Sequence, residues 1–156
     1  MRNSDNRQSI DEFAGVARRY CEWAESPFGE PHEEMGIARE LLAKLHSAIV
    51  DVELDDSGDE TADLVTYEDW YSIMKRFQNL PVDLYWDVFD PLQEESPVLN
   101  TLSDDLSDIY RDLKEGLILY ETGRVAEAVW QWRFDFDIHW GSHLTGAQRA
   151  IHSYFS

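Results

Sequence analysis

The chain has 156 residues, with 32 acidic and 13 basic side chains, so its formal net charge is −19. This length favours one domain, and an apolar content of 43% is too high for an intrinsically disordered protein. A surface this negative repels phosphate backbones and anionic lipids, so we expect neither direct nucleic-acid binding nor membrane binding. One cysteine allows no intramolecular disulfide, and no secretory signal or membrane span is recognisable, so we expect a cytoplasmic protein.

The first half of the chain is predicted to be helical. Residues 1–8 are polar, and we expect a disordered tail there, followed by a single domain over residues 9–156. Apolar residues recur at three- and four-residue spacing over 10–24 and again over 35–52, which predicts two amphipathic helices.

An acidic stretch follows the second helix. Residues 51–69 contain nine acidic side chains and no basic one, and residues 55–60 are predicted to form a solvated loop. Thr66 is a suitable N-cap for a third helix, which Asn79 and Pro81 are predicted to end.

Residues 82–90 are an ambiguous apolar segment between Pro81 and Pro91. Their nearly continuous apolar side chains are compatible with a short helix or a strand. A lone strand would have no partner in the predicted fold, so we expect a short helix or an ordered loop, followed by a linker over residues 91–100.

Two further helices are predicted after this linker. Thr101 and Ser103 are suitable N-caps for a fourth helix, and Gly123 is suited to follow its C-terminus. The last helix is predicted from Val125 almost to the end of the chain, and Gly141 can kink it. Because this helix is apolar on more than one side, we expect it at the centre of the molecule.

Together these segments predict an all-α fold. We expect a single-domain helical bundle of about five helices, with a short ordered segment near residues 82–90. In such a bundle, ligand and metal sites are formed by side chains on facing helices. Candidate site residues are therefore expected to share one face of a helix.

One candidate site binds a metal ion. Asp135, His139 and His143 follow one another at four-residue spacing and would share one face of the last helix. The fourth helix could add carboxylates at the same spacing, namely Asp104, Asp108 and Asp112. A structural interpretation competes with this one, because His143 lies on an apolar stripe and a row of aspartates is usually a solvated helix face. The sequence also lacks the Glu-x-x-His and His-Glu-x-x-His patterns of known metal enzymes.

Other kinds of site have less support. The acidic run fails as an EF-hand, because placing Gly58 at the sixth position puts Leu64 where a bidentate Glu is required. Cys21 lies on an apolar helix stripe and is predicted to be a core residue. No nucleophile elbow and no glycine-rich nucleotide motif occurs.

A second candidate combines aromatic and charged residues. Arg133 lies among aromatic residues and should stack on one of them or pair with a carboxylate such as Asp90 or Asp112. The pattern predicts a buried network that holds segment 82–90 on the last helix, or alternatively an aromatic groove for a ligand or peptide. Its members are Trp86, Asp90, Asp112, Trp132, Arg133 and Trp140.

Several stretches together form a family pattern. They are LPVD at 80–83, WDVFDP at 86–91, LSDDLSDIYRDLK at 102–114, WQWRF at 130–134, HWGSH at 139–143 and AIH at 150–152. The pattern resembles a family of small bacterial proteins classed only as a domain of unknown function, family "fifty sixty-three". The resemblance covers most of residues 10–155. It implies a compact, mainly helical bacterial protein, and it supplies no activity and no catalytic residues.

Three functions follow from these observations. We favour a soluble, non-enzymatic protein-interaction or regulatory protein without a cofactor, whose partner is a protein with a basic surface. The first alternative is a metal-binding helical-bundle enzyme or sensor that holds a divalent transition metal on His139, His143 and nearby carboxylates. The second is an acidic nucleic-acid mimic or inhibitor, which requires carboxylates arrayed on one continuous face.

Overall fold

The structure is a computed structural model that describes residues 2–54 and 63–156. It confirms a mainly helical single domain with one small two-stranded sheet. The loop predicted over 55–60 lies outside the described residues. The elements are α1 (Arg2–Glu25), α2 (Pro31–Ile49), α3 (Tyr67–Phe77), β1 (Leu84–Asp87), β2 (Val98–Thr101), α4 (Leu102–Glu121), α5 (Val125–Val129), the π-helical turns η1 (Trp130–Phe134) and η2 (Phe136–Trp140), and α6 (Gly141–Phe155).

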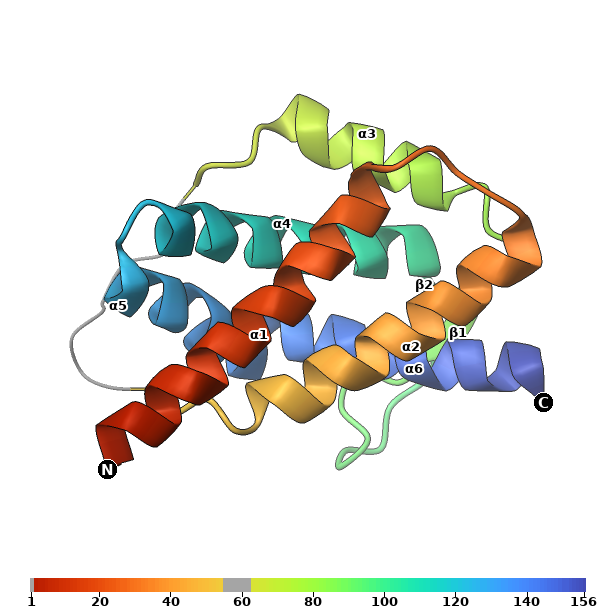
Figure 1. The fold of residues 1–156 in the computed structure, drawn as a ribbon. Helices are drawn as coiled ribbons and strands as arrows, with labels where there is room; N and C mark the ends of the chain where they lie inside the picture. Colours follow the sequence, from red (N-terminus) through yellow and green to blue (C-terminus); the bar gives the residue numbers. More distant parts are fainter. Residues whose placement is uncertain (1, 55–62) are drawn as a thin grey trace.

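The helices pack in two layers. Figure 1 shows α1 and α2 crossing in front of α4 and of the path from α5 to α6, with α3 along one edge. Helix α4 contacts α1, α3, α5 and α6, so it occupies the centre of the molecule. The path from α5 to α6 packs against α4, and its α6 part also against α2, so the predicted last helix shares the interior with α4. No helix in the described part of the chain is long and apolar enough to cross a membrane.

Two of the predicted N-caps, Thr66 and Thr101, are confirmed, whereas Ser103 lies inside α4. Thr66 Oγ1 accepts a hydrogen bond from the Asp69 amide at the start of α3, and Thr101 Oγ1 accepts one from the Asp104 amide at the start of α4. Gly123 follows α4 with a φ of 85°, a conformation that glycine adopts without strain. These local signals determine where the helix carrying the site begins and ends.

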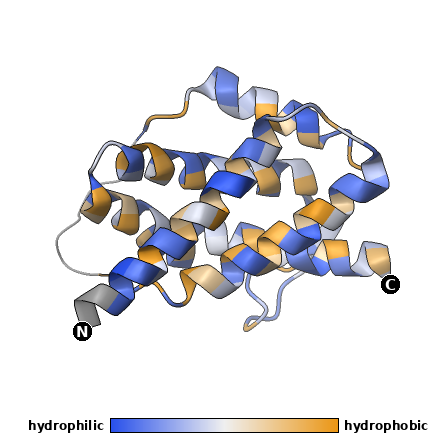
Figure 2. Cartoon of the chain, in the orientation of Figure 1, coloured by the Kyte–Doolittle hydropathy of each residue, from blue (hydrophilic) through white to orange (hydrophobic). Residues whose placement is uncertain are grey.

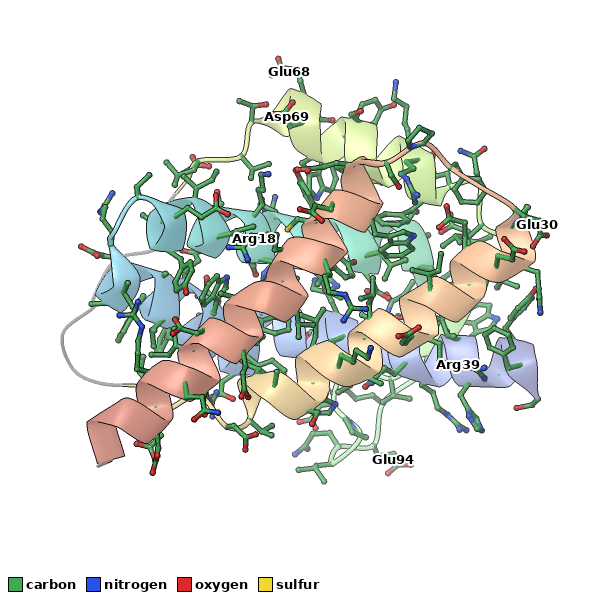
Figure 3. All side chains as sticks on the ribbon, viewed as in Figure 1. Arg18, Glu30, Arg39, Glu68, Asp69 and Glu94 are labelled. Atoms are coloured by element: carbon green, nitrogen blue, oxygen red, sulfur yellow. The ribbon has the colours of Figure 1, made fainter. Side chains whose placement is uncertain are left out.

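The core is formed by the inner faces of the helices. Figure 2 shows their hydrophobic and hydrophilic residues on different sides, as amphipathic packing requires. Phe13 contacts the rings of Trp132 and Trp140, and all three side chains are completely buried. Charged side chains such as Glu68 and Glu94 point away from the body (Figure 3).

Two local predictions are corrected. Residues 2–8 belong to α1 rather than to a tail, and the Asn6 side chain exchanges two hydrogen bonds with the backbone of Glu53. Segment 82–90 contains strand β1, whose antiparallel partner β2 lies in the segment predicted as a linker and pairs Trp86 with Leu99. The strand was missed because its partner is separated from it by a long connection without hairpin-turn residues.

Candidate metal centre

Helix α4 carries a row of four buried acidic side chains. Asp105, Asp108, Asp112 and Glu115 follow at spacings of three, four and three residues, which places them on one face of the helix. Each is at most 9% exposed. Carboxylates are seldom buried unless they are paired or bound to a metal. This face therefore requires partners on the elements packed against it.

The chain segment that faces this row departs from regular α-helix. The turns η1 and η2 are π-helical, a rare geometry that is frequent at functional sites. Gly141 accommodates η2, because a Cβ there would lie 2.2 Å from the carbonyl oxygen of Phe136. Through this path His139 of η2 and His143 of α6 both face α4, with ring centroids 5.0 Å apart.

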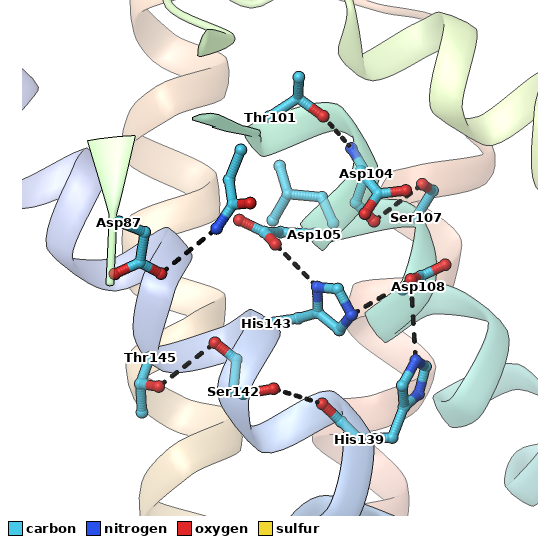
Figure 4. Close-up of polar contacts among 12 residues, drawn as sticks. Asp87, Thr101, Asp104, Asp105, Ser107, Asp108, His139, Ser142, His143 and Thr145 are labelled. Atoms are coloured by element: carbon cyan, nitrogen blue, oxygen red, sulfur yellow. Dashed lines mark hydrogen bonds and ion pairs between the residues drawn. The ribbon is translucent and has the colours of Figure 1, made fainter. Parts of the chain in front are cut away.

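Each histidine is held through its Nδ1 atom by a separate aspartate. His139 Nδ1 lies 2.6 Å from Asp112 Oδ2. His143 Nδ1 lies 2.7 Å from Asp105 Oδ1 (Figure 4). A carboxylate at Nδ1 fixes the orientation of the ring and leaves Nε2 to interact with other groups.

The two Nε2 atoms converge on Asp108 (Figure 4). Asp108 Oδ2 lies 3.2 Å from His143 Nε2 and 3.7 Å from His139 Nε2. The other oxygen, Oδ1, accepts hydrogen bonds from Trp70 Nε1 at 2.8 Å and from Arg111 Nη2 at 3.2 Å. These donors orient the carboxylate so that Oδ2 faces both rings. Asp108, His139 and His143 thus form a triad whose ligand atoms lie within 4.8 Å of one another.

The acidic row makes the histidines more basic. Burial alone would lower the pKa of His143, but hydrogen bonds and charges from Asp105 and Asp108 outweigh burial and raise the pKa to about 10. The hydrogen bond that His139 donates to Asp112 raises the pKa of His139 in spite of burial. Burial acts to raise the pKa of Asp108, yet its contacts with His143 hold that pKa below the usual value.

The β1–β2 hairpin closes one side of this cluster. The Tyr85 hydroxyl donates a hydrogen bond to Asp105 Oδ2, which orients the aspartate behind His143. Gly146 of α6 permits this approach, because a Cβ there would lie 2.7 Å from the tyrosine oxygen. An open hollow of about 360 Å³, lined by both histidines and by Ile138, lies between the hairpin, α4 and the η2–α6 segment. Water and small molecules can therefore reach the histidines.

The comparisons with known proteins identify the family. A family model described as a domain of unknown function, DUF5063, matches residues 4–156. The chain belongs to this family. The DUF5063 match confirms the resemblance derived from the sequence motifs and assigns no activity.

The fold of this DUF5063 chain recurs in a solved structure. It is similar to the crystal structure of protein BF1032 from Bacteroides fragilis, with a TM-score of 0.79 and 21% sequence identity, over 94% of this chain and 91% of that chain. At this identity the similarity concerns the fold alone. No curated protein matches the sequence.

Asp135, which the sequence grouped with the two histidines, lies outside the triad. It is 6% exposed and lies between η1 and η2. Burial raises its pKa to about 6, and the neighbouring charge of Asp112 adds to this rise. Among the described residues, two groups could hold a cation: Asp108 with His139 and His143, and Asp104 and Asp105 with His143; the first contains both histidines.

The predicted network around Arg133 is not assembled in the described part of the chain. Arg133 pairs with Asp137 at 3.0 Å, on its own helical path, rather than with Asp90 or Asp112. Asp112 instead contacts His139. The physical reason is that Asp137 lies four residues after Arg133 on the same helical path, where the Arg133 guanidinium also lies over the Phe136 ring at 5.8 Å.

The tryptophans of that predicted network occupy different environments. Trp132 and Trp140 are fully buried in the core, where their Nε1 atoms donate to the backbone oxygens of Leu113 and Trp132. Trp86 lies on β1 and is 71% exposed. The hairpin is therefore not locked onto the last helix by an aromatic cluster.

Three residues of the site were not singled out from the sequence. They are Asp105, Trp70 and Tyr85, and none of them carries a local sequence signal for this role. The usable signal was the spacing of Asp105, Asp108 and Asp112, which repeats the spacing of the buried apolar positions of α4. The row predicted from the sequence contains Asp104 in place of Asp105, and a solvated helix face is its competing interpretation.

Proposed function

We propose that this protein binds one divalent transition-metal ion through Asp108 Oδ2, His139 Nε2 and His143 Nε2. One observation carries the proposal: both Nε2 atoms face the same carboxylate oxygen, while each Nδ1 is held by a separate aspartate. Histidines that ligate metals typically donate their second ring N–H to a carboxylate or a carbonyl. Asp112 and Asp105 supply these outer partners.

The distances fit a shared cation. Two ligand atoms about 2.1 Å from a metal lie roughly 3.0–3.4 Å apart at octahedral or tetrahedral angles. The separations of 3.2 and 3.7 Å between Asp108 Oδ2 and the two Nε2 atoms are close to this spacing. A metal ion therefore requires only small shifts of side chains that are already oriented.

Ion pairing alone explains less of the geometry. Asp105, Asp108, Asp112 and Arg111 together carry a charge of −2, and Asp104 beside His143 adds one more negative charge. Two imidazolium protons or one divalent cation would offset the same amount of this charge. However, Asp108 would be a poor acceptor for a proton on His139 Nε2, because 3.7 Å to Asp108 Oδ2 is too long for a hydrogen bond. A cation between the three atoms satisfies all of them at once.

The ligand types indicate the class of metal. Two imidazoles and one carboxylate suit zinc or divalent iron and cobalt better than magnesium or calcium, which prefer oxygen ligands alone. Three protein ligands leave coordination positions for water or a substrate. A metal held in this way can acidify bound water or polarise a substrate oxygen, and the partly exposed His139 leaves access to it.

Calorimetry on protein purified without an affinity tag and stripped with a chelator tests the proposal. We expect one equivalent of Zn²⁺ to bind, Co²⁺ to compete with it and develop a visible absorption band, and Mg²⁺ to produce no heat. His143→Gln should abolish binding while keeping a side chain that can bond Asp105. His152→Gln, at an exposed histidine of the same helix, is the matched control and should bind as the wild type does. Absence of Zn²⁺ binding, or equal binding by His143→Gln, would contradict the proposal.

A further inference from the structure

The β1–β2 hairpin exposes a cluster of large apolar side chains, whereas most large apolar side chains in the described part of the chain are at least partly buried. We call this cluster the hairpin patch; its members are Leu84, Trp86, Phe89, Leu92 and Leu99. Trp86 is 71% exposed and Phe89 is 87% exposed. In Figure 1 the connection between β1 and β2 extends away from the helices. Large apolar side chains that are exposed close together in this way typically mark a binding site.

The strand register separates two faces of the hairpin. Tyr85 bonds to Asp105, and its hydroxyl oxygen lies against Gly146 of α6, so this face rests on the protein. Leu84 and Trp86 alternate with Tyr85 and occupy the opposite face. Trp86 lies directly across from Leu99, so the outer face carries an apolar cross-strand pair. An antiparallel sheet with one solvated face normally carries polar residues there.

A groove adjoins this face. It has a volume of about 480 Å³, lies between the hairpin and α6, and is lined by Trp86, Phe89, Pro91, Pro97 and Arg149 among others. Aromatic and proline side chains provide rigid apolar walls, and Arg149 lies on the α6 side. The groove and the outer face share Trp86, so one ligand can contact both.

The charge around the hairpin determines which ligand fits. Residues 82–101, which include the whole hairpin, have five acidic side chains and no lysine or arginine. On the long connection, Glu94 and Glu95 are exposed, and Figure 3 shows Glu94 pointing into solvent. A second copy of this chain would bring a further charge of −19, and an anionic lipid surface would also be repelled. Charge complementarity therefore favours a cationic ligand.

We infer that the hairpin patch docks an extended segment of a partner protein in which apolar side chains alternate with lysine or arginine. The apolar side chains pack on Trp86 and Leu99 and enter the adjoining groove. The basic side chains pair with Glu94 and Glu95 at the rim, which adds attraction and selectivity. Trp86 is the expected energetic centre, because exposed tryptophans that become buried dominate many interfaces. This interaction is independent of the metal proposed at the triad.

Defined peptides test the inference with the full chain and without added metal. The probe is a labelled peptide of about twelve residues in which valine and lysine alternate, measured by fluorescence anisotropy at physiological ionic strength. Two comparison peptides replace every valine by serine or every lysine by glutamate. We expect the valine–lysine peptide to bind at least about tenfold more tightly than either comparison peptide.

Variants locate the contact. Trp86→Ser combined with Leu99→Ser should weaken binding about tenfold or more, whereas Val50→Ser, at an apolar residue that is 58% exposed elsewhere, should leave it unchanged. Circular dichroism and thermal melting check that each variant folds. A single-residue variant, Glu94→Gln, should weaken binding mainly at low salt.

Four outcomes would overturn the inference. They are equal binding of the serine–lysine peptide, unchanged binding by a folded Trp86→Ser/Leu99→Ser variant, a wild-type dimer in sedimentation velocity that this variant abolishes, and flotation of the wild type with phosphatidylcholine or phosphatidylserine vesicles. The last two would assign the patch to a second copy of the chain or to a lipid surface.

Discussion

His139 Nδ1 and Asp112 Oδ2 lie 2.6 Å apart and connect η2 to the middle of α4. The contact orients His139 so that its Nε2 faces Asp108, and the equivalent contact between Asp105 and His143 orients the second ring. The site therefore depends on aspartates that would not themselves touch the metal.

Replacing an outer aspartate should weaken the metal site without removing it. Asp112→Asn keeps a hydrogen-bond acceptor but loses the charge that increases the basicity of His139, so we expect Zn²⁺ affinity to fall about 10- to 100-fold. Asp108→Asn removes a ligand and should abolish binding. Asp137→Asn, at an exposed acid on the same segment, is the control and should have no effect. Competition with a chelating dye measures the Zn²⁺ affinity of each variant. If Asp112→Asn and Asp137→Asn lowered this affinity equally, Asp112 would not be the outer partner that supports the metal site.

Gly141 should be required by the π-helical turn. A Cβ would lie 2.2 Å from the Phe136 carbonyl oxygen, so Gly141→Ala forces the backbone to move and should destabilise the fold by about 2 kcal/mol or more. Gly15→Ala is the matched control, because a Cβ there has no atom within 4 Å. It should instead stabilise α1 by about 0.5–1 kcal/mol. Urea unfolding measures the free energy of unfolding of both variants. If Gly141→Ala were as stable as Gly15→Ala, the π-helical turn would not require glycine at position 141.

Asp135 should make the fold less stable as the pH rises. Its pKa is raised by burial to about 6, above the value of roughly 3.9 in unfolded chains, so the folded state binds its proton more tightly. Its stabilising contribution is complete below about pH 4 and is lost as the pH rises through 6. The groups acting on it from the packed elements are Asp112, Glu115 and His139.

Asp135→Asn removes this titration. We expect the variant to be more stable than the wild type at pH 7 by about 1 kcal/mol, after allowance for screening by water, and to lose the advantage at pH 4. Urea unfolding at the two pH values measures the effect, with Asp137→Asn as the exposed control. An unchanged difference between variant and wild type at the two pH values would refute the prediction.

The buried ion pair between Arg76 and Glu34 should be a strong stability determinant. Their charged atoms lie 2.9 Å apart, and at most 9% of either side chain is exposed. Arg76→Met leaves Glu34 buried without its counter-charge and should cost about 3 kcal/mol. Lys44→Ala breaks an exposed pair with Glu40 and should cost less than about 0.5 kcal/mol. Thermal melting measures the loss of stability in each variant. Equal losses for Arg76→Met and Lys44→Ala would contradict the larger role assigned to the buried pair.

Helices and caps were predictable because their signals are local. Thr66 and Thr101 cap where the sequence places them, and Gly123 adopts the expected left-handed conformation. The β1–β2 pairing was missed because it joins residues across a long connection. The sequence contains no signal for the register that places Trp86 opposite Leu99.

The candidate site was only partly predictable. Four-residue spacing brought His139 and His143 together correctly on one side of their segment. The same spacing wrongly included Asp135, because π-helical turns contain more residues than α-helical ones and shift the angular positions of side chains. Asp108 was considered, but whether a row of aspartates faces solvent or histidines depends on tertiary packing.

The most direct test of the metal site is anomalous X-ray diffraction from crystals soaked in Co²⁺. We predict one strong peak within about 2.2 Å of Asp108 Oδ2, His139 Nε2 and His143 Nε2, with Asp105 and Asp112 still bonded to the Nδ1 atoms. A crystal with no anomalous peak at the triad, in which His143 still bridges Asp105 and Asp108, would show that the cluster is a structural ion-pair network.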